Sequence, residues 1–567
     1  MGPETRKCQN CKNEFTIEPA DFEFYARLKV PPPTFCPECR MQRRMMFRNA
    51  RKLYKRKCGL CGKDTLANIS PDKPFKVYCT KCWWSDKWDG MEFGQDYDPN
   101  RNFFEQLKEL SLKIPYPGLF NNHSTLVNSE YVNHAGNLKN CYLIFDADFN
   151  ENCYYSDNIN HSKDCMDCYY VYENQLCYEN VNTSRNYNTH FSDDCEDCHG
   201  VYFSRDMAGC SDCFGCAGLR RKQYHVFNRP YSKEDYFKKL AEFKLFSYSE
   251  LEKIKKEVQA FWLKSPQKYM HSLQNVNSSG EYVYYSKNAR DCYMASGVED
   301  GRFVQYVNIA PTKDCYDYTE WGNNAQRLYE CMTVGEGADS VRFSFGCVLS
   351  GTLDIDYSMM TGFCQHIFGC IGLFKKSYCI LNKQYSKEDY LKLRAKIIED
   401  MNKNSYVDAR GRVWKYGEFL PYDLSFFDYN ESWAMYCFLK TKDEVLASGW
   451  RWKEDEPITY KITKKAEDLP DDIKDVPDDI FKEIIECLGC KKGFRVVLQE
   501  VAFLRKRGFP LPRKCHECRH LDRLSQINPP KFYSRKCALC EKDVVSPFSP
   551  EKPDILYCEE CYNREVG

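Results

Sequence analysis

Short apolar runs separated by polar turns dominate the middle of the chain, between about residues 125 and 400. The runs are rich in Tyr, Val and Phe, and the segments between them in Asn, Asp, Gly and Ser, which is typical of short strands joined by tight turns. In the first part of this region, cysteines recur every 12 residues, at Cys141, Cys153, Cys165 and Cys177. This regularity favours a parallel β-solenoid, in which equivalent side chains of successive coils stack into columns.

The same region contains one unit twice. A Phe-Gly-Cys-x-Gly-Leu sequence begins at Phe214 and again at Phe368, and a Tyr-Ser-Lys-Glu-Asp-Tyr sequence begins at Tyr231 and again at Tyr385. Residues 125–260 and 276–400 are therefore predicted to be two copies of one solenoid unit. The cysteines of the second copy recur every 16 or 17 residues, at Cys315, Cys331, Cys347 and Cys364.

Each copy ends on a predicted helix. Ser232 and Ser386 each precede a Lys-Glu-Asp sequence, which is typical of a helix N-cap followed by an acidic first turn. The amphipathic runs that follow extend to about Lys256 and Met401. We expect these helices to cap the solenoid ends, because a terminal coil otherwise leaves its apolar surface uncovered.

The two ends of the chain carry a second duplication, of CxxC pairs. The N-terminal pairs are Cys8/Cys11, Cys36/Cys39, Cys58/Cys61 and Cys79/Cys82. The C-terminal pairs are Cys487/Cys490, Cys515/Cys518, Cys537/Cys540 and Cys558/Cys561. Every cysteine of the first set recurs after the same displacement along the chain. The N-terminal segment has no apolar core of a signal peptide, so we expect a cytoplasmic, reducing compartment, where such pairs indicate metal ligands rather than disulfides.

Four thiolates in a tetrahedron satisfy Zn²⁺ and leave no open coordination position. We assign the first two pairs of each end to one ion and the last two pairs to another, which predicts four structural zinc ions. A crossed pairing and iron–sulfur clusters are the alternatives.

The N-terminal motif also resembles a known family. Cys8-x-x-Cys11-x-x-x-Phe15, the aromatic pair Phe24-Tyr25, and Cys36-Pro-Glu-Cys39-Arg40 resemble the zinc-ribbon family with a treble-clef-like fold. The C-terminal copy lacks the proline, since His516 follows Cys515. The whole chain is similar to uncharacterised zinc-ribbon proteins of uncultured bacteria. The resemblance implies zinc, and it implies no particular activity.

These patterns predict a mostly β, multidomain protein with tandem zinc-ribbon modules at each end of a duplicated, Cys- and Tyr-rich parallel β-solenoid with capping helices. The predicted domains are a zinc-ribbon module (1–95), two solenoid units with capping helices (96–265 and 266–402), an aromatic and acidic linker (403–486) and a second zinc-ribbon module (487–567). The linker reads as a tether with short helices. No run of 18 apolar residues exists, so neither a membrane span nor a membrane partner is expected.

The net charge of zero, from 81 basic and 81 acidic residues, hides local segregation. The segment 40–57 contains nine basic residues and no acid: Arg40, Arg43, Arg44, Arg48, Arg51, Lys52, Lys55, Arg56 and Lys57. Such a cluster, with Phe47 and Tyr54 interleaved, predicts a nucleic-acid interface through phosphate contacts and base stacking. The alternatives are a solvated connector or a segment that pairs with the acidic linker. The C-terminal copy is less basic, because Asp522 interrupts it.

Additional CxxC pairs lie inside the first solenoid copy. The favoured interpretation is a packed cysteine ladder, because free cysteine behaves as a small apolar residue. The alternative is an extra metal site formed by Cys195, Cys198, Cys210 and Cys213.

Three functions remain open at this point. The favoured one is a non-enzymatic zinc-binding adaptor whose ribbons bind RNA or a ribonucleoprotein through the basic segment. The second is a structural or protein-interaction scaffold, with a protein partner or self-association. The third and least supported is a carbohydrate-active solenoid enzyme, since stacked carboxylates could form a catalytic pair but no catalytic motif marks one.

Overall fold

The chain is mostly β and is built on a parallel β-solenoid of about 21 turns, as predicted. The structure, a computed structural model, describes residues 2–457 and 459–566, and this part of the chain contains twelve α-helices. Within it, no helix combines the length and the apolar composition needed to cross a membrane.

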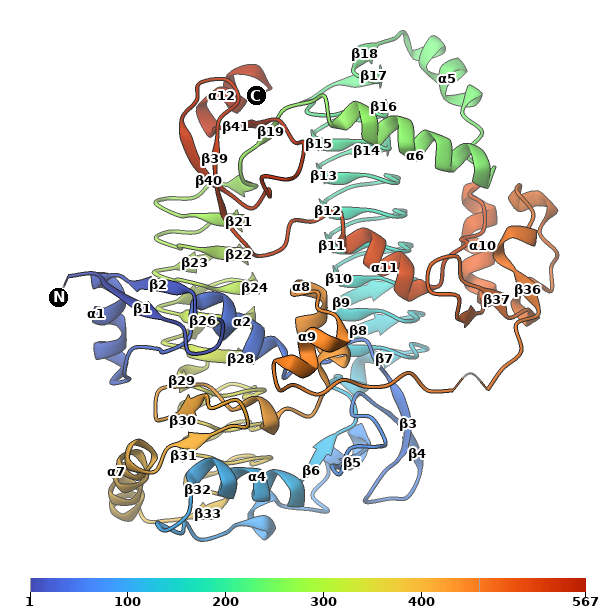
Figure 1. The fold of residues 1–567 in the computed structure, drawn as a ribbon. Helices are drawn as coiled ribbons and strands as arrows, with labels where there is room; N and C mark the ends of the chain where they lie inside the picture. Colours follow the sequence, from blue (N-terminus) through green and yellow to red (C-terminus); the bar gives the residue numbers. More distant parts are fainter. Residues whose placement is uncertain (1, 458, 567) are drawn as a thin grey trace. The chain divides into compact units, whose positions relative to one another are not determined.

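Contacts divide the chain into two units. Figure 1 labels helices and strands of both, coloured along the sequence. Unit 1 comprises the chain up to Leu119, Met270–Glu454 and Pro529–Phe532, and unit 2 comprises Phe120–Tyr269, Asp455–Asn528 and the chain from Tyr533. Unit 1 therefore joins the N-terminal cysteine module to the second solenoid copy, and unit 2 joins the C-terminal module to the first. Each module packs on the solenoid copy that lies farther from it along the chain.

The first solenoid has coils of 12 residues. Its strands are β7 (Leu126–Val127), β8 (Asn133–Lys139), β9 (Phe145–Glu151), β10 (Asp157–Asn160), β11 (Tyr169–Tyr172), β12 (Val181–Ser184), β13 (Asp193–Glu196), β14 (His199–Tyr202), β15 (Arg205–Ala208), β16 (Ser211–Phe214) and β17 (Gln223–Val226). Neighbouring strands are parallel, and Asp157 pairs with Tyr169, which pairs with Val181. The predicted 12-residue period is confirmed.

Every third residue of this solenoid forms a corner. Asn152, Tyr155, Asn158 and His161 all have φ between 51° and 54°, in the left-handed region. Each coil thus has four corners and three residues per side. Asparagine tolerates this conformation better than most residues, and one column of corners is linked by side-chain amides: Asn128 donates to Asn140, which donates to Asn152, which donates to Asp164, at 2.9, 3.1 and 2.8 Å.

The residue after each corner points into the solenoid and is buried. Along one coil these are Cys153, Ser156, Ile159 and Ser162. The narrow interior admits only small or medium side chains, and each polar one bonds to the backbone. The Cys153 thiol donates to the carbonyls of Glu151 and Ser162 at 3.4 and 3.5 Å. Burial raises the pKa of this thiol well above its usual value, so it stays neutral. The cysteines act here as small hydrogen-bonding core residues.

The second solenoid is less regular. Its main strands are β21 (Gly280–Tyr284), β22 (Cys292–Ser296), β24 (Gln305–Ile309), β26 (Tyr316–Gly322), β28 (Tyr329–Gly335), β29 (Asp339–Arg342), β30 (Leu353–Asp356), β31 (Gln365–Phe368) and β32 (Ser377–Ile380). Gly280 pairs with Cys292, but Gln305 pairs with Thr319, two residues farther along. Cys331 pairs with Tyr318 rather than with Cys315. The 16- or 17-residue cysteine spacing is therefore not the coil period.

Helices cap the C-terminal ends of both solenoids, as expected. They are α5 (Lys233–Glu242) and α6 (Tyr248–Trp262) on the first, and α7 (Lys387–Lys403) on the second. Ser232 and Ser386 accept the N–H of Asp235 and Asp389 at 3.1 Å, which confirms both N-caps. The first capping run is broken into two helices rather than one.

The acidic part of the predicted linker belongs to unit 2 and packs within it. Leu469, Ile473, Val476 and Ile480 are buried in one apolar core with residues of α6 and of α10 (Leu498–Arg507). Its acidic residues face outward or accept hydrogen bonds from neighbouring elements, as Asp471 does from the N–H of Ser249 in α6. This segment is therefore a packed element and not a tether.

The tight interior predicts that size, not polarity, limits the inward positions. We expect Cys165→Leu to lower the free energy of unfolding by about 1–3 kcal/mol, because the added volume has no space to occupy. Urea unfolding followed by circular dichroism measures this loss. The matched control is Gln175→Leu, which adds an apolar side chain at an exposed position of the next coil. Equal midpoints for the two variants would contradict a close-packed interior.

Candidate metal centres and their docking helices

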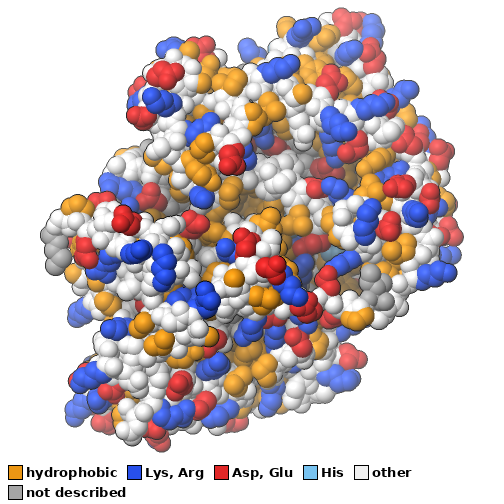
Figure 2. Space-filling view, viewed as in Figure 1, with side chains coloured by type: hydrophobic (Ala, Val, Ile, Leu, Met, Phe, Trp, Pro, Cys, Tyr) orange, Lys and Arg blue, Asp and Glu red, His pale blue; other side chains and the backbone are white. Residues whose placement is uncertain are grey.

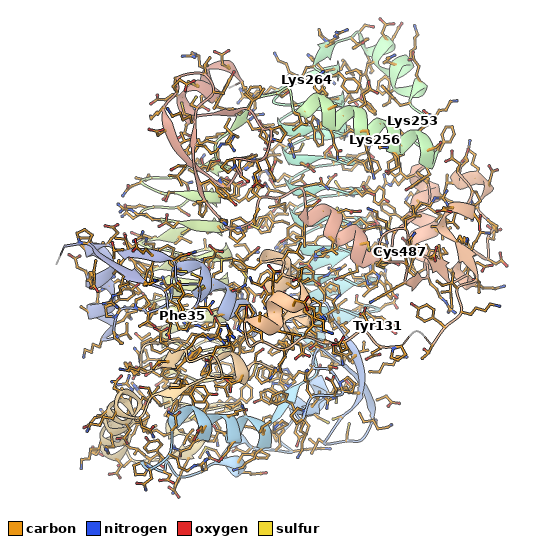
Figure 3. All side chains as sticks on the ribbon, viewed as in Figure 1. Phe35, Tyr131, Lys253, Lys256, Lys264 and Cys487 are labelled. Atoms are coloured by element: carbon orange, nitrogen blue, oxygen red, sulfur yellow. The ribbon has the colours of Figure 1, made fainter. Side chains whose placement is uncertain are left out.

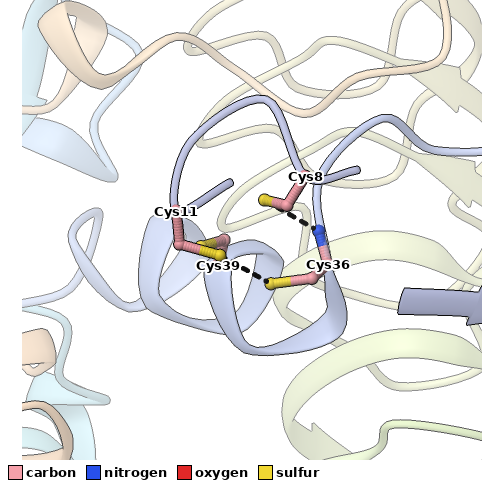
Figure 4. A group of neighbouring side chains, drawn as sticks. All are labelled: Cys8, Cys11, Cys36 and Cys39. Atoms are coloured by element: carbon pink, nitrogen blue, oxygen red, sulfur yellow. Dashed lines mark hydrogen bonds between the residues drawn. The ribbon is translucent and has the colours of Figure 1, made fainter. Parts of the chain in front are cut away.

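The sixteen predicted cysteines form four separate groups, each with the pairing that the sequence predicted. In every group the four sulfur atoms lie within 4.8 Å of one another. Figure 4 shows the group of Cys8, Cys11, Cys36 and Cys39, in which the sulfurs of Cys11 and Cys36 are 3.7 Å apart. All 34 cysteines are free thiols.

Each group is built by a hairpin followed by a helix. In the first, β1 (Glu4–Lys7) pairs with β2 (Glu14–Ile17), and α2 (Pro37–Met45) begins directly after Cys36. In the second, β3 (Tyr54–Lys57) pairs with β4 (Asp64–Ala67), and α3 (Thr80–Trp83) begins after Cys79. The hairpin turn supplies two sulfurs and the helix start supplies two.

Backbone N–H groups favour the thiolate form at these sites. The N–H of Cys36 donates to the sulfur of Cys8 at 3.3 Å, and that of Cys79 to the sulfur of Cys58 at 3.2 Å. Burial acts to raise the pKa of Cys58, but backbone hydrogen bonds from Cys61, Cys79 and Leu60 lower it to about 6. Four sulfurs with a thiolate at neutral pH fit a structural Zn²⁺ ion, which these side chains alone would hold.

The C-terminal module repeats this construction. There α11 (His516–Leu524) begins after Cys515, whose N–H donates to the sulfur of Cys487 at 3.2 Å. The second group lies between the hairpin of β39 (Tyr533–Lys536) and β40 (Asp543–Ser546) and helix α12 (Glu559–Glu565). In each of the four groups, one cysteine is exposed: Cys11, Cys61, Cys490 and Cys540. A full set of four ligands supports a structural role.

The alternative metal site inside the first solenoid is not formed. Cys195, Cys198, Cys210 and Cys213 are absent from the possible metal-binding groups of the described residues. They occupy successive inward positions along two coils and bond to the backbone, as Cys195 does with the carbonyl of Asp193 at 3.1 Å. Cys198 and Cys210 lie one coil apart in a single column, and the four sulfur atoms do not come together within 4.8 Å as those of the terminal groups do, so the packed cysteine ladder describes them.

The basic segment is the largest departure from the sequence-based interpretation. Arg40, Arg43, Arg44 and Arg48 are 1% exposed or less, and Arg51 is 9% exposed. Lys52 and Arg56 are half-buried, and Lys55 and Lys57 are exposed. The five arginines are thus not accessible to a phosphate backbone, and the nucleic-acid interface that was predicted to use them is corrected on this point.

Carboxylates of the second solenoid hold these arginines. Arg40 and Arg44 pair with the two oxygens of Asp317 at 2.9 and 3.3 Å. Arg44 also pairs with Glu330 at 3.0 Å. Arg43 pairs with Glu330 at 2.6 Å and with Glu418 of the predicted linker at 3.1 Å. One alternative, pairing with the linker, is thus correct for one contact, but the solenoid supplies most partners.

The C-terminal module docks in the same way. Arg519 and Arg523 of α11 pair with the two oxygens of Asp167 at 2.6 and 2.8 Å, and Arg519 also pairs with Glu500 at 3.0 Å. Arg519 and Arg523 correspond to Arg40 and Arg44 in the duplicated module. Asp167 and Asp317 follow the equivalent cysteines Cys165 and Cys315 by two residues. Both modules therefore use one docking device.

Fold and site together define a β-solenoid protein with four-cysteine metal centres compatible with zinc-ribbon-like modules. No protein-family model matches the chain, and no curated protein matches it. A solved structure described as a proposed acetyltransferase from Desulfovibrio desulfuricans G20 is 9% identical and covers 50% of this chain and 84% of its own, with a TM-score of 0.11. A likeness at that TM-score supports no conclusion about fold or activity.

The four groups predict the metal content of the chain. We expect four zinc ions per chain by elemental analysis, and about three in either Cys39→Ser or Cys561→Ser, because a site with three thiolates binds zinc weakly. Cys437→Ser, which changes a cysteine outside the groups, is the matched control and retains four. Fewer than three ions in the unaltered chain would contradict the assignment.

The docked arginines predict an asymmetric response to charge removal. Arg44→Ala leaves Asp317 and Glu330 buried with less compensating charge, so we expect the free energy of unfolding of unit 1 to fall by about 3–5 kcal/mol. Lys57→Ala removes an exposed cation and is the control, with little expected change. Chemical denaturation of both variants tests this, and similar midpoints would show that the buried pairs contribute nothing.

Proposed function

We propose that this protein is a non-enzymatic β-solenoid scaffold, and that its zinc-ribbon-like modules act as clamps on the solenoids. One observation carries the proposal. In each unit, a pair of arginines at equivalent positions of the two modules is buried against a solenoid aspartate: Arg40 and Arg44 against Asp317, and Arg519 and Arg523 against Asp167. The helix that bears these arginines begins at a cysteine of a metal group, so the metal's role would be to hold the helix in its docked position. The proposal places the protein in a reducing compartment, as free thiols require.

The arrangement of charge supports a protein partner over a nucleic acid. Figure 2 shows Lys and Arg interspersed with Asp and Glu over the visible face, without a continuous basic surface. The arginines that would have provided such a surface are buried. Nucleic-acid binding would have to rely on the remaining exposed lysines, of which Lys55 and Lys57 belong to the predicted strip.

A side of the first solenoid offers a surface for a protein. Phe149, Tyr172 and Tyr187 are exposed there, and Lys139, Glu151 and Lys163 form a charge ladder between coils, with distances of 2.9 and 3.0 Å. Exposed aromatic side chains bordered by paired charges are typical of protein interfaces. Phe149 and Tyr187 each have one face covered by a histidine of the next coil, His161 at 4.8 Å and His199 at 5.2 Å, which leaves less open ring surface for the stacking of a sugar or base.

The proposal is tested with the full chain and two kinds of probe. We expect no saturable binding of a fluorescent single-stranded RNA at low salt, and no difference for the variant K55E/K57E. We also expect a stoichiometric protein to co-purify after nuclease treatment and to be lost from the variant F149S/Y172S/Y187S. The control for that variant is Q175S, on the same side of the solenoid. RNA binding that weakens with salt and disappears in K55E/K57E would restore the nucleic-acid hypothesis.

A further inference from the structure

The two modules dock in one pose but differ at one position of the docking helix. Arg40 and Arg519 each contact the Oδ2 atom of the solenoid aspartate, and Arg44 and Arg523 each contact its Oδ1 atom. Between them, Arg43 of α2 corresponds to Asp522 of α11, which is a reversal of charge. Arg43 is fully buried, whereas Asp522 is exposed and pairs with Lys514 at 2.8 Å.

Each solenoid carries a glutamate one coil beyond the docking aspartate. In the second solenoid this is Glu330, which follows Tyr329, the partner of Tyr316. In the first it is Glu179, which follows Tyr178, the partner of Met166. The two glutamates therefore hold equivalent positions, and the positive charge of the docked arginines stabilises the carboxylate form of each.

The two glutamates obtain their counter-charge from different elements. Glu330 is fully buried and pairs with Arg43 and Arg44 of the docked module. Glu179, a quarter of whose side chain is exposed, pairs at 2.9 Å with Lys255 of the capping helix α6. Burial acts to raise the pKa of Glu179, but the charges of Lys255, Arg523 and Arg519 lower it overall. In unit 1 the docked module thus supplies the cation that neutralises the glutamate, which is Arg43. In unit 2 the capping helix α6 supplies it, as Lys255.

Exchanging the modules would bring like charges together in both places. Helix α11 on the second solenoid would place Asp522 beside Glu330 and Glu418, with no cation in the position of Arg43. Helix α2 on the first solenoid would bring Arg43 toward Glu179, which already forms an ion pair with Lys255. Glu330 is fully buried, so an aspartate brought beside it is strongly unfavourable and excludes the wrong module there. Lys255 and Glu179 are partly exposed, so the repulsion at the first solenoid is weaker.

We propose that the residue at this position, Arg43 in one module and Asp522 in the other, determines which zinc module docks on which solenoid. The partner surface that each module fits is a β-solenoid face with an aspartate and, one coil later, a glutamate. In the second solenoid that glutamate, Glu330, pairs with arginines of the docked module, whereas in the first solenoid Glu179 pairs with Lys255 of the solenoid's own capping helix. This inference rests on the clamp role proposed above, and it adds the basis of pairing.

The test uses the full chain with a photo-crosslinking amino acid in place of Met41, a buried residue of α2. Crosslinked peptides are identified by mass spectrometry. In the otherwise unaltered chain we expect crosslinks to residues 305–345 of the second solenoid. Arg43→Asp should reduce them about tenfold or more, a loss that corresponds to at least one buried charge repulsion. Arg43→Met, which removes the charge without reversing it, should reduce them less.

A second set of variants tests the other solenoid. Lys255→Ala should speed limited proteolysis of residues 487–528 several-fold, because Glu179 loses its cation while docked arginines remain. Adding Asp522→Arg should restore resistance, since an arginine at that position reaches the same glutamate in the other unit. The control is Lys253→Ala, which alters an exposed lysine of the same helix, labelled in Figure 3.

The outcomes separate the possible failures. Equal crosslinking by Arg43→Asp and Arg43→Met would overturn the proposal, because charge sign would then not matter. Failure of Asp522→Arg to rescue Lys255→Ala would also overturn it. Zinc content is measured for every variant. If Arg43→Asp retains four ions and unchanged crosslinks, the role of Arg43 in choosing the solenoid is refuted, but the clamp role is not. If the unaltered chain shows no crosslinks between α2 and the second solenoid, the clamp role itself is refuted.

Discussion

Each unit depends on the ion pairs between one solenoid aspartate and two arginines of a four-cysteine module. Asp317 and its partners Arg40 and Arg44 are almost entirely buried, so each charge is tolerable only while the others stay in place. That requirement passes to α2, a helix of nine residues that is too short to be stable alone. The four-cysteine group would provide what the helix lacks if a metal is bound, because Cys36 is the N-cap of α2 and Cys39 lies in its first turn, directly before Arg40. A bound metal would thus hold the helix, and the helix would hold its arginines against the solenoid aspartate.

The solenoid can offer such a socket because its coils stack in parallel register, even where they differ in length. A corner at every third residue turns one side chain inward and leaves the next two for the outer faces. Asp317 and Glu330 therefore lie on adjacent coils, close enough to share one arginine. The same geometry explains the abundance of cysteine. An inward side chain must be small and must satisfy nearby carbonyls, and a thiol such as that of Cys165 does both, with contacts to Lys163 and Asn174 at 3.3 and 3.5 Å.

The features that sequence could predict are those set by local spacing. The four metal groups follow from CxxC pairs at fixed separations, and the 12-residue coil follows from Cys141 to Cys177 because coils of constant length repeat their columns. In the second solenoid the coils vary in length, so cysteines of different columns gave a misleading period. The burial of the arginines was beyond such reasoning, since Asp317 and Glu330 are distant in the sequence. One signal was present: Met41, Met45, Met46 and Phe47 lie among the arginines, and so many apolar residues indicate a buried helix rather than a solvated strip.

The crossed arrangement of modules and solenoids makes discrimination between the two sockets a requirement of folding. During synthesis the N-terminal module is complete before either solenoid, and the first socket to emerge, around Asp167, belongs to the other module. Helix α2 already carries the two arginines that fit an aspartate of this kind. Only a difference beyond that shared pair can keep α2 from the first socket until Asp317 is made. Lys255 pairs with Glu179, the glutamate one coil beyond Asp167, so the proposed repulsion is available once α6 has been made and before Asp317 has been. Duplication supplied two equivalent clamps, and the reversed charge at Arg43 and Asp522 is the difference by which we propose that each finds its own solenoid.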